Sequence, residues 1–145
     1  MVNWKGVLTV AVLMAIAAQI IHTVGAVLTM GYYVDPQYSS VWSKLMMPSA
    51  GPPPASFVII SLGIGFITSL IFAWFYTVVK DSIPGDAPTN KGLNYGLMLY
   101  LVAGVPFIAT NFLLINLPLG ITVSWFFEGL LVYLIGGFLA ARILK

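Results

Sequence analysis

Four long runs of apolar residues determine most of what this chain can fold into. They cover approximately residues 6–30, 55–79, 93–115 and 121–144. A helix needs about 20 mainly apolar residues to cross the hydrocarbon core of a bilayer. Because backbone N–H and C=O groups cannot stay unpaired in lipid, we predict that each run is a helix. The chain is therefore expected to be an all-α integral membrane protein, a single domain over residues 1–145 built as a bundle of four transmembrane helices.

The composition indicates that lipid is the solvent around this chain. Hydrophobic residues make up 60% and charged residues 7%, and the mean hydropathy is +1.01. Soluble domains carry roughly 25% charged residues. Six basic and four acidic residues are too few for the clustered basic face that nucleic-acid binding requires. The absence of cysteine excludes disulfides, thiolate metal sites and cysteine nucleophiles.

The basic residues predict the orientation. In a four-span layout Lys44 lies on one side, and the other five lie on the opposite side: Lys5, Lys80, Lys91, Arg142 and Lys145. The positive-inside rule assigns the side with five to the cytoplasm. We expect a multi-pass protein of the cell membrane, a prokaryotic inner membrane, with both termini cytoplasmic and an outer loop over residues 31–54. The first apolar run is longer than a signal-peptide core, so we interpret it as a retained helix.

Polar side chains inside the predicted spans are the candidate functional residues, because such groups are costly in hydrocarbon without a partner. At ~1.5 Å of rise per residue, Gln19, His22, Asn111 and Glu128 all fall in the outer half of the bilayer. Gln19 and His22 are three residues apart and share a helix face. Ser124 lies four residues before Glu128 and shares a face with it.

Three interpretations of this polar cluster stay open. In the first, its members form interhelical hydrogen bonds that fix the packing, each contributing about 1 kcal/mol. In the second, His22 and Glu128 form a proton-responsive or ligand-binding pair that faces an outward cavity. In the third, the cluster faces a partner subunit.

The sequence predicts neither a cofactor nor a metal, and no enzyme. His22, Met30, Met46 and Met47 offer soft ligands that would suit Cu(I), but methionine is more often a space-filler. One histidine cannot supply paired axial ligands to haem within one chain, which leaves open single-histidine ligation and a haem or pigment shared with a partner. Phosphate-binding glycine loops, Ser–His–Asp constellations and the His-Glu-x-x-His motif are absent from the sequence.

Small residues at helical spacing predict close helix packing. The candidate packing residues are Gly92, Gly96, Gly104, Gly136 and Gly137. Pro106 lies inside the third apolar run. Its ring blocks a helical hydrogen bond, so we expect it to bend this helix and to free a carbonyl near Val102.

Two parts of the chain share their layout with known sequences. Between Gly25 and Lys44, a glycine-bearing helix exit leads to the aromatic pair Tyr32-Tyr33 and then to Val41-Trp42-Ser43-Lys44. The stretch Phe72-Ala73-Trp74-Phe75-Tyr76 ends the second run, and residues 91–97 open the third. This layout resembles a family of small four-helix prokaryotic membrane proteins of unknown function. The resemblance implies the fold and supplies no activity.

Together these features predict a non-enzymatic membrane protein that acts by helix packing or binding. It would be a self-associating bundle or an accessory subunit of a larger membrane complex. The alternative is a small transporter or receptor for an apolar or protonatable ligand, which would use the outer-half polar cluster. The expected partners are the lipid bilayer and other copies or subunits, and nucleic acid is not among them.

Overall fold

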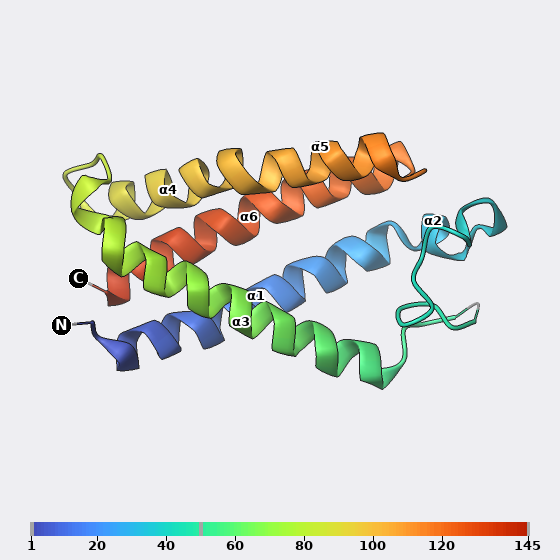
Figure 1. Ribbon diagram of the computed structural model, residues 1–145, viewed down its shortest axis with the longest axis horizontal. Helices are drawn as coiled ribbons and strands as arrows, with labels where there is room; N and C mark the ends of the chain where they lie inside the picture. Colours follow the sequence, from blue (N-terminus) through green and yellow to red (C-terminus); the bar gives the residue numbers. More distant parts are fainter. Residues whose placement is uncertain (1, 50, 145) are drawn as a thin grey trace.

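The computed structural model describes residues 2–49 and 51–144, and within these residues the chain forms helices and turns without a strand. Four helical stretches are long and apolar enough to cross a membrane: Trp4–Leu28, Ala55–Ser82, Pro88–Leu114 and Leu119–Ile143. All four extend along the long axis of the molecule: the third and fourth lie side by side, whereas the first and second cross near their middles (Figure 1). The predicted all-α fold with four candidate spans is therefore confirmed.

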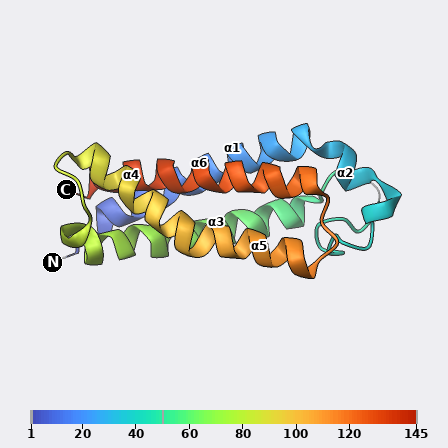
Figure 2. The same ribbon diagram turned by 90° about the horizontal axis from the view of Figure 1, so that it is seen from above.

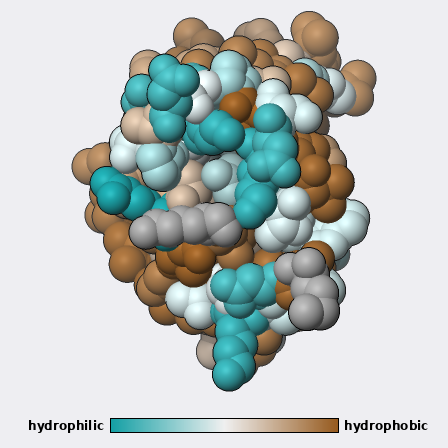
Figure 3. All heavy atoms as spheres, turned by 90° about the vertical axis from the view of Figure 1, so that its left-hand side faces the viewer, coloured by the Kyte–Doolittle hydropathy of each residue, from teal (hydrophilic) through white to brown (hydrophobic). Residues whose placement is uncertain are grey.

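Both termini lie at one end of the molecule, and the segment between the first two spans lies at the other (Figures 1 and 2). We call these the termini end and the loop end. Hydrophilic residues gather at the termini end (Figure 3). Two lysines there bond to backbone carbonyls: Lys80 Nζ donates to Leu144 at 3.3 Å and Lys91 Nζ donates to Lys80 at 3.3 Å. Lys145 lies outside the described residues.

The first span is helix α1, Trp4–Leu28. It begins before the predicted residue 6 because Asn3 caps it, with the side-chain oxygen accepting a hydrogen bond from the Gly6 N–H at 3.0 Å. The loop after α1 contains two short elements, and hydropathy could not predict either of them. They are helix α2, Met30–Val34, and a 3₁₀ turn, Pro36–Tyr38.

The second and fourth spans match the predicted runs closely. Helix α3, Ala55–Val79, starts directly after the proline run and is followed by a 3₁₀ turn, Lys80–Ser82. Helix α6 covers Leu119–Ile143. Proline precedes each helix, at Pro54 and Pro118, and its fixed φ suits the extended backbone found at both positions.

The third span is built in three pieces. Helix α4, Pro88–Leu99, leads into a π turn, Tyr100–Gly104, and then into helix α5, Val105–Leu114. The span begins at Pro88 rather than near residue 93 because proline favours the first helical turn, although the residues after it are polar.

The π turn lies just before Pro106, which occupies the first turn of α5. The Val105 N–H donates to the Tyr100 carbonyl, which closes the π turn. Pro106 follows in the first turn of α5, where the absence of its N–H is tolerated. The Tyr100 hydroxyl donates to the Phe126 carbonyl on α6 at 2.7 Å and anchors the turn. The third span changes direction where α4 passes into α5, as the bend expected at Pro106 requires (Figure 2).

Helix α6 packs against α1, α3, α4 and α5, and its closest approach is to α4. A Cβ atom on Gly92 or Gly96 would collide with the backbone of α6, and one on Gly137 would collide with the Gly92 carbonyl. These three glycines therefore pack within the chain. Gly136 lies instead against Met14 on α1, while Gly104 lies against the Tyr100 ring of its own span.

Two apolar clusters stabilise the packing. The termini-end core joins α1, α3, α4 and α6, and includes Val7, Val10, Met14, Phe72, Tyr76, Tyr95, Val132 and Ala140. The loop-end cluster consists of Tyr33, Trp42, Leu117 and Ile121, with Ala26, Val41, Met46, Met47 and Trp125 packed around it. The loop-end cluster attaches the segment after α1 to the start of α6.

The half of α3 nearest the loop end is the least packed part of the four spans. None of residues 55–68 is buried. In Figure 1 α3 crosses α1 near the middle of both helices, and beyond this crossing the loop-end half of α3 diverges from α1, α5 and α6. Ser61 and Gly65 lie four residues apart on this half, and a Cβ added to Gly65 would meet open space.

Candidate functional site

A carboxylate held between two helices forms the centre of the candidate site. Glu128 on α6 is 7% exposed, although it is an acidic residue in a candidate membrane span. Its Oε2 lies 2.8 Å from His22 Nδ1 on α1. Its Oε1 accepts a hydrogen bond from the Ser124 hydroxyl, one turn earlier on α6. Both carboxylate oxygens are therefore paired, as a buried carboxylate requires.

The geometry of the two helices brings these side chains together. The Cα of His22 lies about 9 Å from the end of α1 at Leu28, and the Cα of Glu128 lies about 13 Å from the start of α6 at Leu119. Side chains tilt toward the N-terminus of their helix. Because α1 and α6 run in opposite directions, His22 tilts toward the termini end and Glu128 toward the loop end (Figure 1). The tilts close the difference in depth.

Gly25 makes room for the carboxylate on α1. A Cβ atom at this position would collide with all three atoms of the Glu128 carboxyl group. Gly25 is buried and lies one turn after His22, so the carboxylate sits against the backbone of α1. Gly25 was not among the site residues predicted from the sequence. The available signal was a glycine three residues after the only histidine of the chain.

The pair lies between the two apolar clusters along the α1–α6 interface. Toward the loop end, Tyr33, Ile121 and Trp125 belong to or pack around the loop-end cluster. Toward the termini end, Ile21 and Val132 belong to or pack around the termini-end core. Burial also raises the pKa of the Tyr33 phenol above its ordinary value of 10.0, which keeps the phenol neutral. The α1–α6 interface is therefore packed by apolar side chains on both sides of the pair, toward the loop end and toward the termini end.

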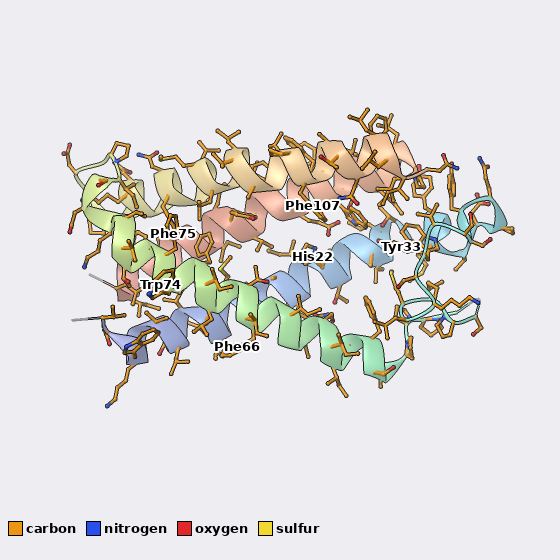
Figure 4. The ribbon with its side chains drawn as sticks, viewed as in Figure 1. His22, Tyr33, Phe66, Trp74, Phe75 and Phe107 are labelled. Atoms are coloured by element: carbon orange, nitrogen blue, oxygen red, sulfur yellow. The ribbon has the colours of Figure 1, made fainter. Side chains whose placement is uncertain are left out.

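His22 is the exposed member of the site. Its side chain is 54% exposed, whereas that of Glu128 is 9% exposed. Figure 4 shows His22 between α1 and α6, with Tyr33 farther toward the loop end. Nδ1 is paired with Glu128, and Nε2 has no hydrogen-bond partner among the described residues. The ring is therefore held at Nδ1 and is just over half exposed beside the α1–α6 interface.

Comparisons with family models, characterised proteins and solved structures gave no match to this chain. The likeness to small four-helix membrane proteins stays a prediction. The function must accordingly be argued from the site.

Two of the five predicted site residues do not bond to Glu128. Gln19 Nε2 donates to Thr23 Oγ1 on its own helix at 3.2 Å. Asn111 Nδ2 donates to the Phe107 carbonyl, also on its own helix, at 2.8 Å. The hydrogen-bonded group consists of His22, Ser124 and Glu128. Gln19 and Asn111 were predicted at a similar depth in the membrane, but they do not belong to this group.

The remaining polar and soft groups do not form a further site. Within residues 2–49 and 51–144, there is no group of three or more His, Cys, Asp or Glu side chains that could hold a metal ion. Met46 and Met47 pack against the loop-end cluster, and Met30 is exposed on α2. A shallow apolar depression between α5 and α6 is lined by Ile108, Thr122, Val123, Phe126 and Phe127.

The arrangement can hold and orient a proton, because a carboxylate and an imidazole share one hydrogen bond. Ser124 occupies Oε1, so the carboxylate presents Oε2 to the ring. The ring in turn presents a single free nitrogen, Nε2, at the surface of α1. A partner that meets this site would therefore contact the imidazole and not the carboxylate.

Proposed function

We propose that this chain is a small non-enzymatic membrane protein that binds another membrane-embedded component. It would work as a self-associating bundle or as an accessory subunit of a larger complex. We also propose that it resides in a prokaryotic inner membrane with both termini in the cytoplasm. The orientation is supported by the five basic residues on the side of the termini against Lys44 on the other side.

The unpacked half of α3 carries this proposal. None of residues 55–68 is buried, and this half-helix diverges from the other three spans (Figure 1). Ser61 and Gly65 place two small residues four positions apart on it. Small residues at this spacing let a second helix approach closely in lipid. By contrast, Gly92, Gly96 and Gly137 are already used to pack α4 against α6.

The proposal is tested by the mass of the protein in lipid nanodiscs and after gentle extraction from its native membrane. We expect a complex larger than one chain. Gly65→Leu should disrupt it, because a leucine side chain would fill the space next to the helix backbone. Ala109→Leu is the matched control, since Ala109 is an exposed small residue on α5. A single chain under both conditions, or equal effects of the two variants, would contradict the proposal.

A second candidate function is a small receptor or transporter for an apolar or protonatable ligand. The observation that favours it is the paired carboxylate inside one chain. Glu128 bonds to Ser124 and His22, and the ring of His22 is half exposed. Polar groups at this depth are costly unless they serve packing or a function, and helix packing alone does not require an exposed imidazole.

Replacing Glu128 with glutamine tests this second candidate. The substitution keeps the shape of the side chain and removes its negative charge. We expect it to change proton-coupled flux in proteoliposomes or the stabilisation of the protein by a ligand. Gln19→Leu is the matched control, because Gln19 bonds only within α1. If neither readout distinguishes Glu128→Gln from Gln19→Leu, the pair acts in packing alone.

A further inference from the structure

The protonation of the His22–Glu128 pair determines what the free nitrogen of the ring can bind. Because Ser124 donates to Oε1, a carboxyl proton can sit only on Oε2, and the pair is electrically neutral in two arrangements. An imidazolium can face a carboxylate, or a neutral imidazole can accept the carboxyl proton at Nδ1. In both arrangements Nε2 carries a hydrogen. Loss of that hydrogen would leave a net negative charge in a site of low dielectric, which is costly.

The surface of α1 at His22 is therefore a hydrogen-bond donor aimed out of the protein. The side chain is 54% exposed, and Nε2 has no partner among the described residues. Acyl chains of lipid offer no acceptor, and an unpaired donor in hydrocarbon costs free energy. The loop-end cluster and the termini-end core close the interface on either side along the helix axis. The donor is thus reached sideways, from the lipid.

The depth of His22 restricts the source of the acceptor. Helix α1 is ~37 Å long, whereas the hydrocarbon core is ~30 Å thick. About 3–4 Å of the helix therefore extends beyond the core at each end if α1 is centred. The Cα of His22 lies about 9 Å from Leu28, and its side chain tilts farther from the loop end. The ring consequently lies deeper than the edge of the hydrocarbon. The ester carbonyls of lipids are found at that edge, so they do not reach the ring.

We propose that His22 Nε2 is the polar contact of a binding site for a free apolar molecule that carries a carbonyl oxygen, as a lipophilic quinone does. Such a molecule dissolves in the hydrocarbon core and brings its own acceptor to this depth. Its carbonyl accepts the hydrogen bond from Nε2, and its apolar body lies in the lipid beside α1. Glu128 acts as a positioning residue, because its contact at Nδ1 leaves Nε2 as the nitrogen that carries the outward hydrogen in a pair without net charge. This inference rests on the second candidate function and names its ligand class.

His22 is the only histidine of the chain, so ¹⁵N-histidine labelling reports on this one ring. The experiment records the ¹⁵N signals of the full chain in lipid nanodiscs at neutral pH, with decylubiquinone as the probe. We expect Nε2 to be protonated without the probe and its signal to shift saturably as decylubiquinone is added. Dodecylbenzene, an apolar molecule without a carbonyl, should leave the signal in place.

The same titration is followed by thermal stabilisation, which allows variants without the histidine. His22→Phe should weaken the apparent affinity for decylubiquinone by about two- to tenfold, as expected for the loss of one hydrogen bond. Asn111→Leu is the matched control and should bind like the wild type, because Asn111 bonds only to its own helix. Folding of each variant is checked by its unfolding transition without the probe.

Three results would overturn the inference: an unprotonated Nε2 at neutral pH, equal responses to decylubiquinone and dodecylbenzene, or unchanged affinity in folded His22→Phe. A signal that shifts with the protein-to-lipid ratio and ignores the probe would also overturn it, because the acceptor would then come from a second copy. That last result would support the self-association proposed above. A failed inference and a failed receptor function stay distinguishable, because the Glu128→Gln flux assay does not use this probe.

Discussion

Replacing Gly25 with alanine tests how closely Glu128 is held against α1. The new methyl group would overlap the carboxyl group of Glu128, which has no free space to move into because it is 7% exposed. The carboxylate must therefore leave its position, or the two helices must separate. Either response weakens the hydrogen bond between Glu128 and His22.

Three effects determine the size of the loss. Forcing a methyl group into a packed interface costs about 1–3 kcal/mol. Losing an interhelical hydrogen bond inside a membrane protein costs about 0.6 kcal/mol on average and up to about 1.7 kcal/mol. Alanine regains about 1 kcal/mol because it is the better helix former. We therefore expect Gly25→Ala to reduce the free energy of unfolding by about 2 kcal/mol.

The free energy of unfolding can be measured in mixed micelles by titrating a denaturing detergent and following the fluorescence of the four tryptophans. Gly63→Ala is the matched control. It lies inside α3, and a Cβ there meets nothing within 4 Å, so this substitution should cause no loss. In the Glu128→Ala background, Gly25→Ala should cause little further loss, which corresponds to a coupling energy of about 2 kcal/mol. A Gly25→Ala protein as stable as Gly63→Ala, or a loss that persists without the carboxylate, would refute this reasoning.

Three further predictions use the same unfolding measurement. Tyr95→Phe removes the 2.6 Å hydrogen bond from the Tyr95 hydroxyl to the Phe72 carbonyl and should cost about 0.5–1.5 kcal/mol; no loss would mean that this bond adds nothing. Gly137→Ala should cost at least about 2 kcal/mol, because its methyl group meets the Gly92 carbonyl and a backbone cannot rotate away as a side chain can; a neutral effect would contradict the close α4–α6 packing. Burial raises the pKa of Tyr33, so the unfolded chain loses the phenol proton at a lower pH than the folded chain does. The stability that the neutral phenol contributes is therefore complete below pH 10 and is lost as the pH rises through the folded-state pKa. Tyr33→Phe should therefore show a shallower loss of stability above pH 10 than the wild type, and equal slopes would argue against a buried phenol.

The spans could be predicted from the sequence because hydropathy sums over more than 20 residues. The predicted ends were least accurate where local chemistry decides them. Asn3 starts α1 earlier by capping it, and Pro88 starts α4 within a polar stretch. The short helix α2 could not be found by hydropathy, because a five-residue helix has too few turns to produce a periodic pattern.

Depth, which the rise per residue gives directly, put His22 and Glu128 at a similar level, and their pairing was one of three interpretations left open. Depth put Asn111 at this level as well, but Asn111 does not bond to Glu128, because contact also requires the correct angle around the helix. The π turn at Tyr100–Gly104 adds a residue to one turn and rotates α5 relative to α4 by about 100°. Sequence periodicity does not reveal such a turn. Gly25 was missed because its role depends on a carboxylate more than 100 residues away, which only the fold brings near.

The long separation between His22 and Glu128 has a consequence for how the chain is made. The two residues are 106 positions apart, with one in the first span and the other in the last. At about 5–20 residues per second, roughly 5–20 s of synthesis pass before the partner of His22 exists. During that time the first span carries an uncompensated imidazole, and α6, which packs against the other three spans, is missing. We therefore expect the first three spans to lack both this bond and their packing against α6 until the last span is made.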